Sequence, residues 1–186
     1  MISSMAGAIV RLLEKQHAID PKQREVYIYG CDIALYTLIS TLSLLMIGFV
    51  FGLFLETLIC IAVFYLNQSL GGGYHADTHM QCFLTMAAGL LAYILSFSFL
   101  LCSVVYIILG YLSLLILFSF PLVLHKHKAY LIRHKNKLIM RSRISTSLQL
   151  VFFSLIIILS VSSLVQSFAS AFTLCAASRL AAKYTL

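Results

Sequence analysis

The sequence of 186 residues contains no tryptophan, only two prolines and few charged residues. Charged residues make up 10% of the chain, with thirteen lysines and arginines against six aspartates and glutamates. Hydrophobic residues make up 61% of it and the mean hydropathy is +1.00, values far outside the range of soluble domains. A water-soluble fold is therefore excluded.

Several sequence motifs are also missing. No C-x-x-C pair occurs among the five cysteines, so we expect no disulfide framework. The run Gly71 to Gly73 lacks the Lys-Ser/Thr of a phosphate-binding loop, so no ATP site and no other cofactor is expected. The first thirty residues hold no continuous apolar region before a small-residue cleavage site, so a secretory signal is not expected.

What the sequence does contain is three long apolar stretches, at 33–66, 82–124 and 144–182. A bilayer core of about 30 Å needs about 20 apolar residues per helix, so each stretch has room for two spans. The two spans of each pair are expected to meet near Gly48 to Gly52, near Cys102 and Ser103, and near Gln166 to Ser170. The predicted fold class is all-α, a single polytopic integral membrane domain (1–186) of about six transmembrane helices.

Lysine and arginine predict the orientation, because cytoplasmic loops retain positive charge. With six spans all thirteen cations fall on one side, and the three predicted outer turns hold none. We therefore expect a multi-pass protein of the bacterial cell membrane with both termini, the loop after span two and a basic loop at 125–143 in the cytoplasm. The net charge of +7 then reflects topology and contact with anionic membrane lipid, and nucleic-acid binding is not expected.

Residues 1–20 are predicted to form an amphipathic helix in the cytoplasmic membrane interface. Its apolar face comprises Ile2, Met5, Ile9, Leu12 and Leu13. Asp20 and Pro21 then resemble an N-cap and a first helical position, from which a helix is expected to run through Tyr27 and Tyr29 into the first span.

The segment 67–82, between spans two and three, concentrates groups that can perform chemistry. After three glycines it holds two histidines, an aspartate and a cysteine within eight residues. Glycines break a helix and permit a turn. Thr78 and Gln81 match a capping box that would start span three and place Cys82 in its first turn. There the helix dipole favours the thiolate and lowers a cysteine pKa.

A base for this thiol is also available. His75 lies seven residues before Cys82, which is about 10.5 Å along a continuous helix, so direct pairing requires His75 to lie outside the helix. His79 is the rival base. Asp77, Asn67 and Gln68 could orient an imidazole, and the residue pattern does not choose among them. Free backbone amides in the glycine loop or in the first turn of span three could stabilise an oxyanion.

The run Gly72, Gly73, His75 and Cys82 after a second span, in a basic membrane chain of this length, resembles the accessory gene regulator B (AgrB) family. The layout of the whole chain is similar to it as well. The resemblance implies a membrane cysteine endopeptidase that cleaves an AgrD-like quorum-sensing propeptide before its acidic C-terminal tail. His75 would activate Cys82, and the resulting acyl-enzyme would pass its acyl group to a propeptide side chain, closing a thiolactone or lactone. It also suggests a homodimer.

One departure from that family concerns a basic residue that usually precedes the glycines, where this chain has Asn67, Gln68 and Ser69. Gly72, Gly73 and Asp77 are candidate supporting residues of the site. The cations of the basic loop could attract the acidic tail of the propeptide, and the alternative is that they serve topology alone. These candidate substrate-binding cations are Lys126, Lys128, Arg133, Lys135 and Lys137.

Two other functions compete with a cysteine peptidase. A zinc-dependent intramembrane hydrolase could use His75 and His79 with Asp77 or Cys82, but the chain lacks the glutamate of an H-E-x-x-H motif, so no metal is expected. A transporter without covalent chemistry is supported by Glu56, an ionisable residue within span two. The remaining cysteines have no histidine nearby and are interpreted as inert apolar residues: Cys31, Cys60, Cys102 and Cys175.

Overall fold

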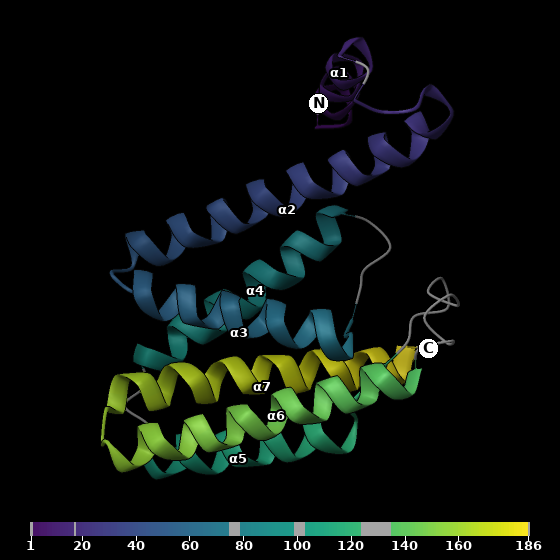
Figure 1. Ribbon diagram of the computed structural model, residues 1–186. Helices are drawn as coiled ribbons and strands as arrows, with labels where there is room; N and C mark the ends of the chain where they lie inside the picture. The colour runs from purple at the N-terminus through teal and green to yellow at the C-terminus, as the bar shows by residue number, and fades with distance from the viewer. Residues whose placement is uncertain (1, 17, 75–78, 99–102, 124–134, 186) are drawn as a thin grey trace. The chain divides into compact units, whose positions relative to one another are not determined.

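The computed structural model describes residues 2–16, 18–74, 79–98, 103–123 and 135–185, and all its regular elements are helices (Figure 1). A short 3₁₀ turn, Pro21–Gln23, precedes the second helix. The helices are α1 (Ile2–Lys15), α2 (Arg24–Val50), α3 (Phe54–Gly71), α4 (His79–Ser98), α5 (Ser103–Ser119), α6 (Lys135–Ile158) and α7 (Ser162–Thr185).

Six of these helices are apolar enough to lie in a membrane. Four have the length and composition of complete spans: Arg24–Val50, Phe54–Gly71, Lys135–Ile158 and Ser162–Lys183. Two shorter apolar helices, Met80–Leu95 and Val104–Ser119, lie between them in the chain. The predicted fold class, an all-α polytopic membrane protein with an N-terminal amphipathic helix, is confirmed.

The predicted break of the first pair of spans is correct and that of the third pair is wrong. The break predicted near Cys102 and Ser103 lies largely outside the described residues. In the first pair, α2 ends at Val50 and α3 begins at Phe54. In the last pair, the break lies at 159–161, whereas the middle of the expected turn is Phe168, eight residues later. The expected turn, 166–170, lies inside α7 because its small residues pack instead of turning: Ser167 and Ala169 are fully buried. The actual turn uses Ser160 in a left-handed conformation, with φ of 55°.

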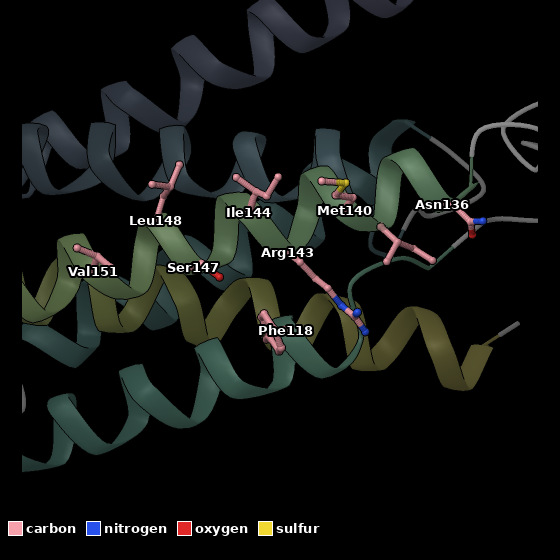
Figure 2. Close-up of a pocket in the computed structure, with 9 residues that line it drawn as sticks. Phe118, Asn136, Met140, Arg143, Ile144, Ser147, Leu148 and Val151 are labelled. Atoms are coloured by element: carbon pink, nitrogen blue, oxygen red, sulfur yellow. The ribbon is translucent and has the colours of Figure 1, made fainter.

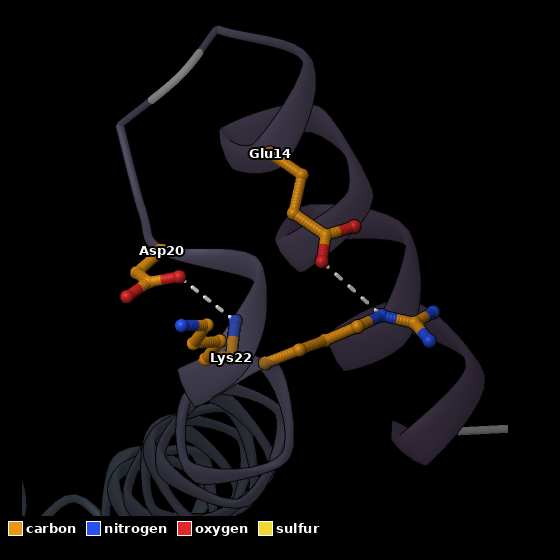
Figure 3. A network of polar contacts seen from close by, with 4 residues as sticks. Glu14, Asp20 and Lys22 are labelled. Carbon is orange, nitrogen blue, oxygen red and sulfur yellow. Dashed lines mark hydrogen bonds and ion pairs between the residues drawn. The ribbon is translucent and has the colours of Figure 1, made fainter.

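The chain divides into two compact units, residues 1–46 and 47–186. In the first, α1 forms as predicted, and its side chains Met5, Ile9 and Leu12 remain exposed. This leaves an apolar face suited to the membrane interface. Figure 3 shows how the junction before α2 is held: the Asp20 carboxylate accepts a hydrogen bond of 2.9 Å from the Lys22 amide, as an N-cap residue does.

An ion pair adds to this junction. The Glu14 carboxylate of α1 lies 3.4 Å from the Arg24 Nε atom at the start of α2 (Figure 3). Both side chains are partly exposed, so the pair contributes about 1 kcal/mol or less to stability. The pair links α1 to the start of α2 within the first unit.

In the second unit α7 forms the centre of the packing and contacts α3, α4, α5 and α6. Its small residues let neighbouring helices approach closely, as is usual between helices in membranes. Gly110 of α5 faces the Phe153 ring and Ala169, and the Phe153 and Phe172 rings meet edge to face at 5.6 Å. Polar side chains of α7 pair with α5 within this core: the Gln166 amide donates to Tyr106 at 2.9 Å.

The second unit brings three helix ends together. α3, α5 and α7 finish at the end of the bundle where α6 begins (Figure 1). The Val123 amide, just after α5, donates a 2.9 Å hydrogen bond to the Gly71 carbonyl at the end of α3. The segment that carries the candidate chemistry therefore leaves α3 beside the ends of α5 and α7.

Candidate active site

The glycine run ends α3 as predicted. Gly71 is the last helical residue, and Gly72 follows with φ of 70°, donating its amide to the Gln68 carbonyl at 3.0 Å. A Cβ atom at position 72 would meet the Val123 carbonyl, so this turn requires glycine both for its conformation and for its close approach. Gly73 packs against the Gln68 side chain.

The chain after these glycines is attached to α7. The Tyr74 amide donates to the carbonyl oxygen of Ser178 at 3.1 Å and contacts its hydroxyl at 3.2 Å. The Gln68 amide group donates to the same hydroxyl at 3.2 Å. Tyr74 immediately precedes His75, so hydrogen bonds hold the backbone up to the residue before the candidate base.

Cys82 lies in the first turn of α4, as the capping-box spacing predicted, because this helix begins at His79. Its side chain is half-buried, whereas Cys60 and Cys175 are buried, so reagents can reach Cys82 more readily than these two. Cys31 is also half-buried but lies inside α2, away from a helix start. The four described cysteines are free thiols.

Several predicted site residues fall outside the described residues: His75, Asp77, Thr78, Lys126, Lys128 and Arg133. The pairing of His75 with Cys82 therefore remains a prediction. Among the residues that the structure does describe, no three histidine, cysteine or acidic side chains are grouped so that they could share a metal ion. That observation does not bear on the zinc alternative, which depends on His75.

Two side chains that could have oriented an imidazole are engaged elsewhere. The Asn67 side chain is 4% exposed and its amide donates to the Val63 carbonyl at 2.9 Å and to Gln149 at 3.2 Å. The Gln68 amide donates to Ser178, but its buried Oε1 atom has no hydrogen-bond partner among the described residues. The Gln68 Oε1 atom is therefore able to accept a further hydrogen bond.

Arg179 is one of the thirteen cations that the charge pattern explains by topology, and it lies beside the glycines. Its side chain is 1% exposed, and its guanidinium donates to the carbonyls of Leu117 and Phe120 at 3.0 Å and of Asn67 at 3.2 Å. Gly71 packs directly against it. A lone arginine inside an otherwise uncharged stretch of α7 was the signal that could have indicated a specific site.

The cations at the start of α6 are exposed, and the described part of the basic segment, from Lys135 onward, is helical. The Lys135 and Lys137 side chains are exposed on the surface of the bundle. The Arg143 guanidinium lies 5.5 Å from the centre of the Phe118 ring. Such a cation–π contact lets an arginine keep its charge near the membrane surface. The described part of this cluster is thus open to solvent and headgroups.

A groove of about 660 Å³ extends along α6, and of these three cations Arg143 lines it (Figure 2). Asn136 and Arg143 lie toward one end of it, and Leu148 and Val151 lie toward the other. An apolar groove with a cationic end fits an acyl chain and its anionic headgroup. A second groove, between α3, α6 and α7, is also apolar, and neither groove is lined by Cys82 or the glycines.

Glu56, on which the transporter alternative rests, lies in the first turn of α3, at the opposite end of that helix from the glycines. A carboxylate there is stabilised by the helix dipole. Its backbone carbonyl accepts a 2.8 Å hydrogen bond from the Tyr93 hydroxyl of α4. The helix dipole therefore explains a carboxylate at position 56 without an ion pathway.

The fold and this segment define a polytopic helical membrane protein with a cysteine at a helix start, next to a glycine turn that α7 holds in place. The family model for Accessory gene regulator B matches residues 6–178, which is nearly the whole chain. The chain belongs to the AgrB family.

A curated relative supports this assignment. The protein named "Putative AgrB-like protein 2" of Clostridium perfringens (strain 13 / Type A) is 29% identical over 82 residues, which cover 44% of this chain and 38% of that protein. The match thus spans well under half the length of the relative. No solved structure matches this chain.

Proposed function

We propose that this protein is a membrane cysteine endopeptidase that removes the C-terminal tail of an AgrD-like quorum-sensing propeptide and cyclises the remainder. The observation that carries the proposal is the half-buried Cys82 in the first turn of α4. Membership of the AgrB family, together with the anchored glycine turn just before His75, supports it.

In the first step His75 takes the proton of the Cys82 thiol. The thiolate attacks the carbonyl carbon of the peptide bond before the acidic tail, and the tetrahedral oxyanion collapses with cleavage of the C–N bond. The imidazolium returns its proton to the leaving amine. The tail departs with a new N-terminus, and the propeptide remains as a thioester on Cys82.

In the second step a thiol or hydroxyl of the propeptide attacks that thioester. The Cys82 sulfur leaves as thiolate and takes up the proton, and a thiolactone or lactone ring closes. When the attacking group is a thiol, one thioester replaces another, so the exchange is near thermoneutral. This step therefore needs no nucleotide or other cofactor.

The start of α4 offers a means of stabilising the oxyanion. The first amides of a helix point out of its N-terminal end, and we propose that the backbone in the first turn of α4 stabilises a negatively charged oxygen near Cys82. The helix dipole acts in the same direction and offsets part of the cost that partial burial imposes on the Cys82 thiolate.

Recruitment of the propeptide is the proposed role of the basic segment. Lys135 and Lys137 are exposed where α6 begins, at the end of the bundle where α3 finishes, and a cationic surface there would attract an acidic tail. Anionic lipid at the Arg143 groove would keep this surface at the membrane. We further propose that this face and both termini are cytoplasmic, by the distribution of cations.

The proposal also includes a homodimer. Small residues permit close helix contact in membranes, and the chain has two such stretches. The stretch 167–171 is used within the chain, where Ala169 and Ala171 are fully buried. The other, Ala87 to Gly89 in α4, keeps Ala88 exposed and is the better candidate for an interface.

The deciding experiment follows cleavage and ring closure of a synthetic AgrD-like propeptide by mass spectrometry with the protein in liposomes. Cys82→Ala and His75→Ala should abolish both products, whereas His79→Ala and a matched control, Cys31→Ala, should retain them. A strong zinc chelator should have no effect. Cleavage without Cys82 would disprove the cysteine mechanism, and loss of cleavage on chelation would favour the zinc alternative.

A further inference from the structure

Arg179 is a buried cation without an acidic partner among the described residues. The ion pair found in the described part of the chain joins Glu14 and Arg24, far from α7 in the sequence. Removing a charge from water costs several kcal/mol unless other groups replace the solvent. Around the Arg179 guanidinium, three backbone carbonyls take the place of water: those of Leu117, Phe120 and Asn67.

These carbonyls come from the ends of two helices. Leu117 and Phe120 lie in and just after the last turn of α5, and Asn67 lies one turn before the end of α3. Carbonyls at a helix C-terminus carry the negative end of the helix dipole, which favours a cation. A single guanidinium therefore ties the end of α3 to the end of α5.

The same end of α7 also holds the segment that follows α3. Gly71 lies so close to the Arg179 guanidinium that a Cβ atom there would collide with it. Ser178, the neighbouring residue, accepts the Tyr74 amide and the Gln68 side chain. Two adjacent residues of α7 thus fix both ends of the stretch from Gly71 to Tyr74.

We infer that Arg179 is a positioning residue for the peptidase reaction, a role that rests on the proposed function. It touches neither Cys82 nor, because its side chain is 1% exposed, any substrate. It acts through the backbone, because it sets where the chain leaves α3. That point determines from where the chain continues to His75 and the start of α4. A displacement of about 1 Å in such a group can lower a rate about a hundredfold.

The alternative is that Arg179 serves only as a topological cation or as part of general packing. Lys183 provides the matched control, because it lies one turn further along α7 and its ammonium sits 4.1 Å from the centre of the ring of Phe120, whose carbonyl binds Arg179. Arg179→Met and Lys183→Met each remove one positive charge from the same helix end. Only the first removes the hydrogen bonds to the three carbonyls.

The first test measures steady-state cleavage of a propeptide that the wild-type protein processes. Arg179→Met should lower kcat by about tenfold to a hundredfold with KM changed by less than about twofold, and Lys183→Met should leave both near the wild-type values. Arg179→Lys keeps the charge but not the planar fork, so it should lower kcat as well. Equal behaviour of the two Met variants, or an effect on KM alone, would overturn the inference.

A second test uses the substitution Gly71→Ala, which perturbs the Arg179 guanidinium without removing it. Gly71→Ala should lower kcat in the wild-type background, because its methyl group displaces the guanidinium. In the Arg179→Met background the same change should cost little more, since the shorter side chain leaves space for it. Additive effects of the two substitutions would show that they act separately and would contradict the inference.

Hydrogen exchange followed by mass spectrometry separates this inference from the proposed function. In Arg179→Met, amides of the segment 71–74 should exchange faster, while those in the middle of α5 and α7 should not change. Faster exchange in that segment confirms its anchoring even if no propeptide is ever cleaved, in which case only the proposed function fails. Uniformly faster exchange would assign Arg179 to general folding, and unchanged exchange would refute the anchoring.

Discussion

At the scale of the residue, Gly72 combines two constraints that can be separated by experiment. Its φ of 70° is unfavourable for any residue with a Cβ atom, and that atom would also meet the Val123 carbonyl. Gly52 has the same φ of 70°, but a Cβ atom there would find open space. Substitutions at these two glycines therefore distinguish the effect of conformational strain from the effect of displacing the glycine turn.

We expect both Gly72→Ala and Gly52→Ala to destabilise the folded protein by about 1 to 2 kcal/mol through strain. Only Gly72→Ala should also reduce propeptide cleavage, because it pushes the glycine turn away from Val123. Thermal unfolding in detergent and mass spectrometry of the cleaved peptide would measure the two effects. Full cleavage by Gly72→Ala would show that the turn tolerates this displacement.

The cysteines allow a second prediction at this scale. A maleimide should modify the half-buried Cys82 and Cys31 within the time in which the buried Cys60 and Cys175 stay unmodified. If the start of α4 favours the thiolate, Cys82 should react faster than Cys31 at neutral pH. Intact-mass and peptide mass spectrometry would give the rates, and slower modification of Cys82 than of Cys31 would contradict activation of the nucleophile.

At the scale of the helix, small residues in α5 and α7 decide how closely the elements pack. Gly110 faces the Phe153 ring, which is fully buried and cannot easily move. We expect Gly110→Ala to destabilise the protein by about 1 to 3 kcal/mol through overpacking. Gly30→Ala in α2, where a Cβ atom meets nothing within 4 Å, is the control and should be neutral or stabilising in thermal unfolding.

The third break between spans is instructive at the same scale. Serine and alanine at 166–170 resemble a turn when only hydropathy is considered, but in α7 they face other helices. The Ser167 hydroxyl donates to the Ser163 carbonyl at 2.7 Å, so its polarity is satisfied within the helix. Sequence periodicity cannot distinguish such a packed polar residue from a turn, because the distinction depends on neighbours from other helices.

At the scale of the whole molecule, the orientation in the membrane gives the broadest prediction. In a cysteine-free variant, single cysteines at Ser69 and Asn136 should be protected from a membrane-impermeant maleimide in intact cells. Cysteines at Phe51 and Ser160 should be labelled. All four positions are exposed in the structure, so differences in labelling report the side of the membrane. Labelling of Ser69→Cys in intact cells would place the candidate site outside and contradict the proposed topology.

The sequence by itself determined the membrane class, the amphipathic helix, the first break between spans and the position of Cys82 at a helix start. It did so because hydropathy, glycine and helix capping act over a few neighbouring residues. The resemblance carried by Gly72, Gly73, His75 and Cys82 also indicated the AgrB family, which the family comparison confirmed.

Only the tertiary structure decided what surrounds the glycine turn. Tyr74 and Ser178 are 104 residues apart, and Asn67 and Arg179 are 112 apart, so no local pattern could connect them. The charge pattern explains Arg179 by topology alone, whereas the structure places its guanidinium on three backbone carbonyls beside the glycine turn. Such partners are set by the packing of α3, α5 and α7, which depends on the shape of the whole bundle.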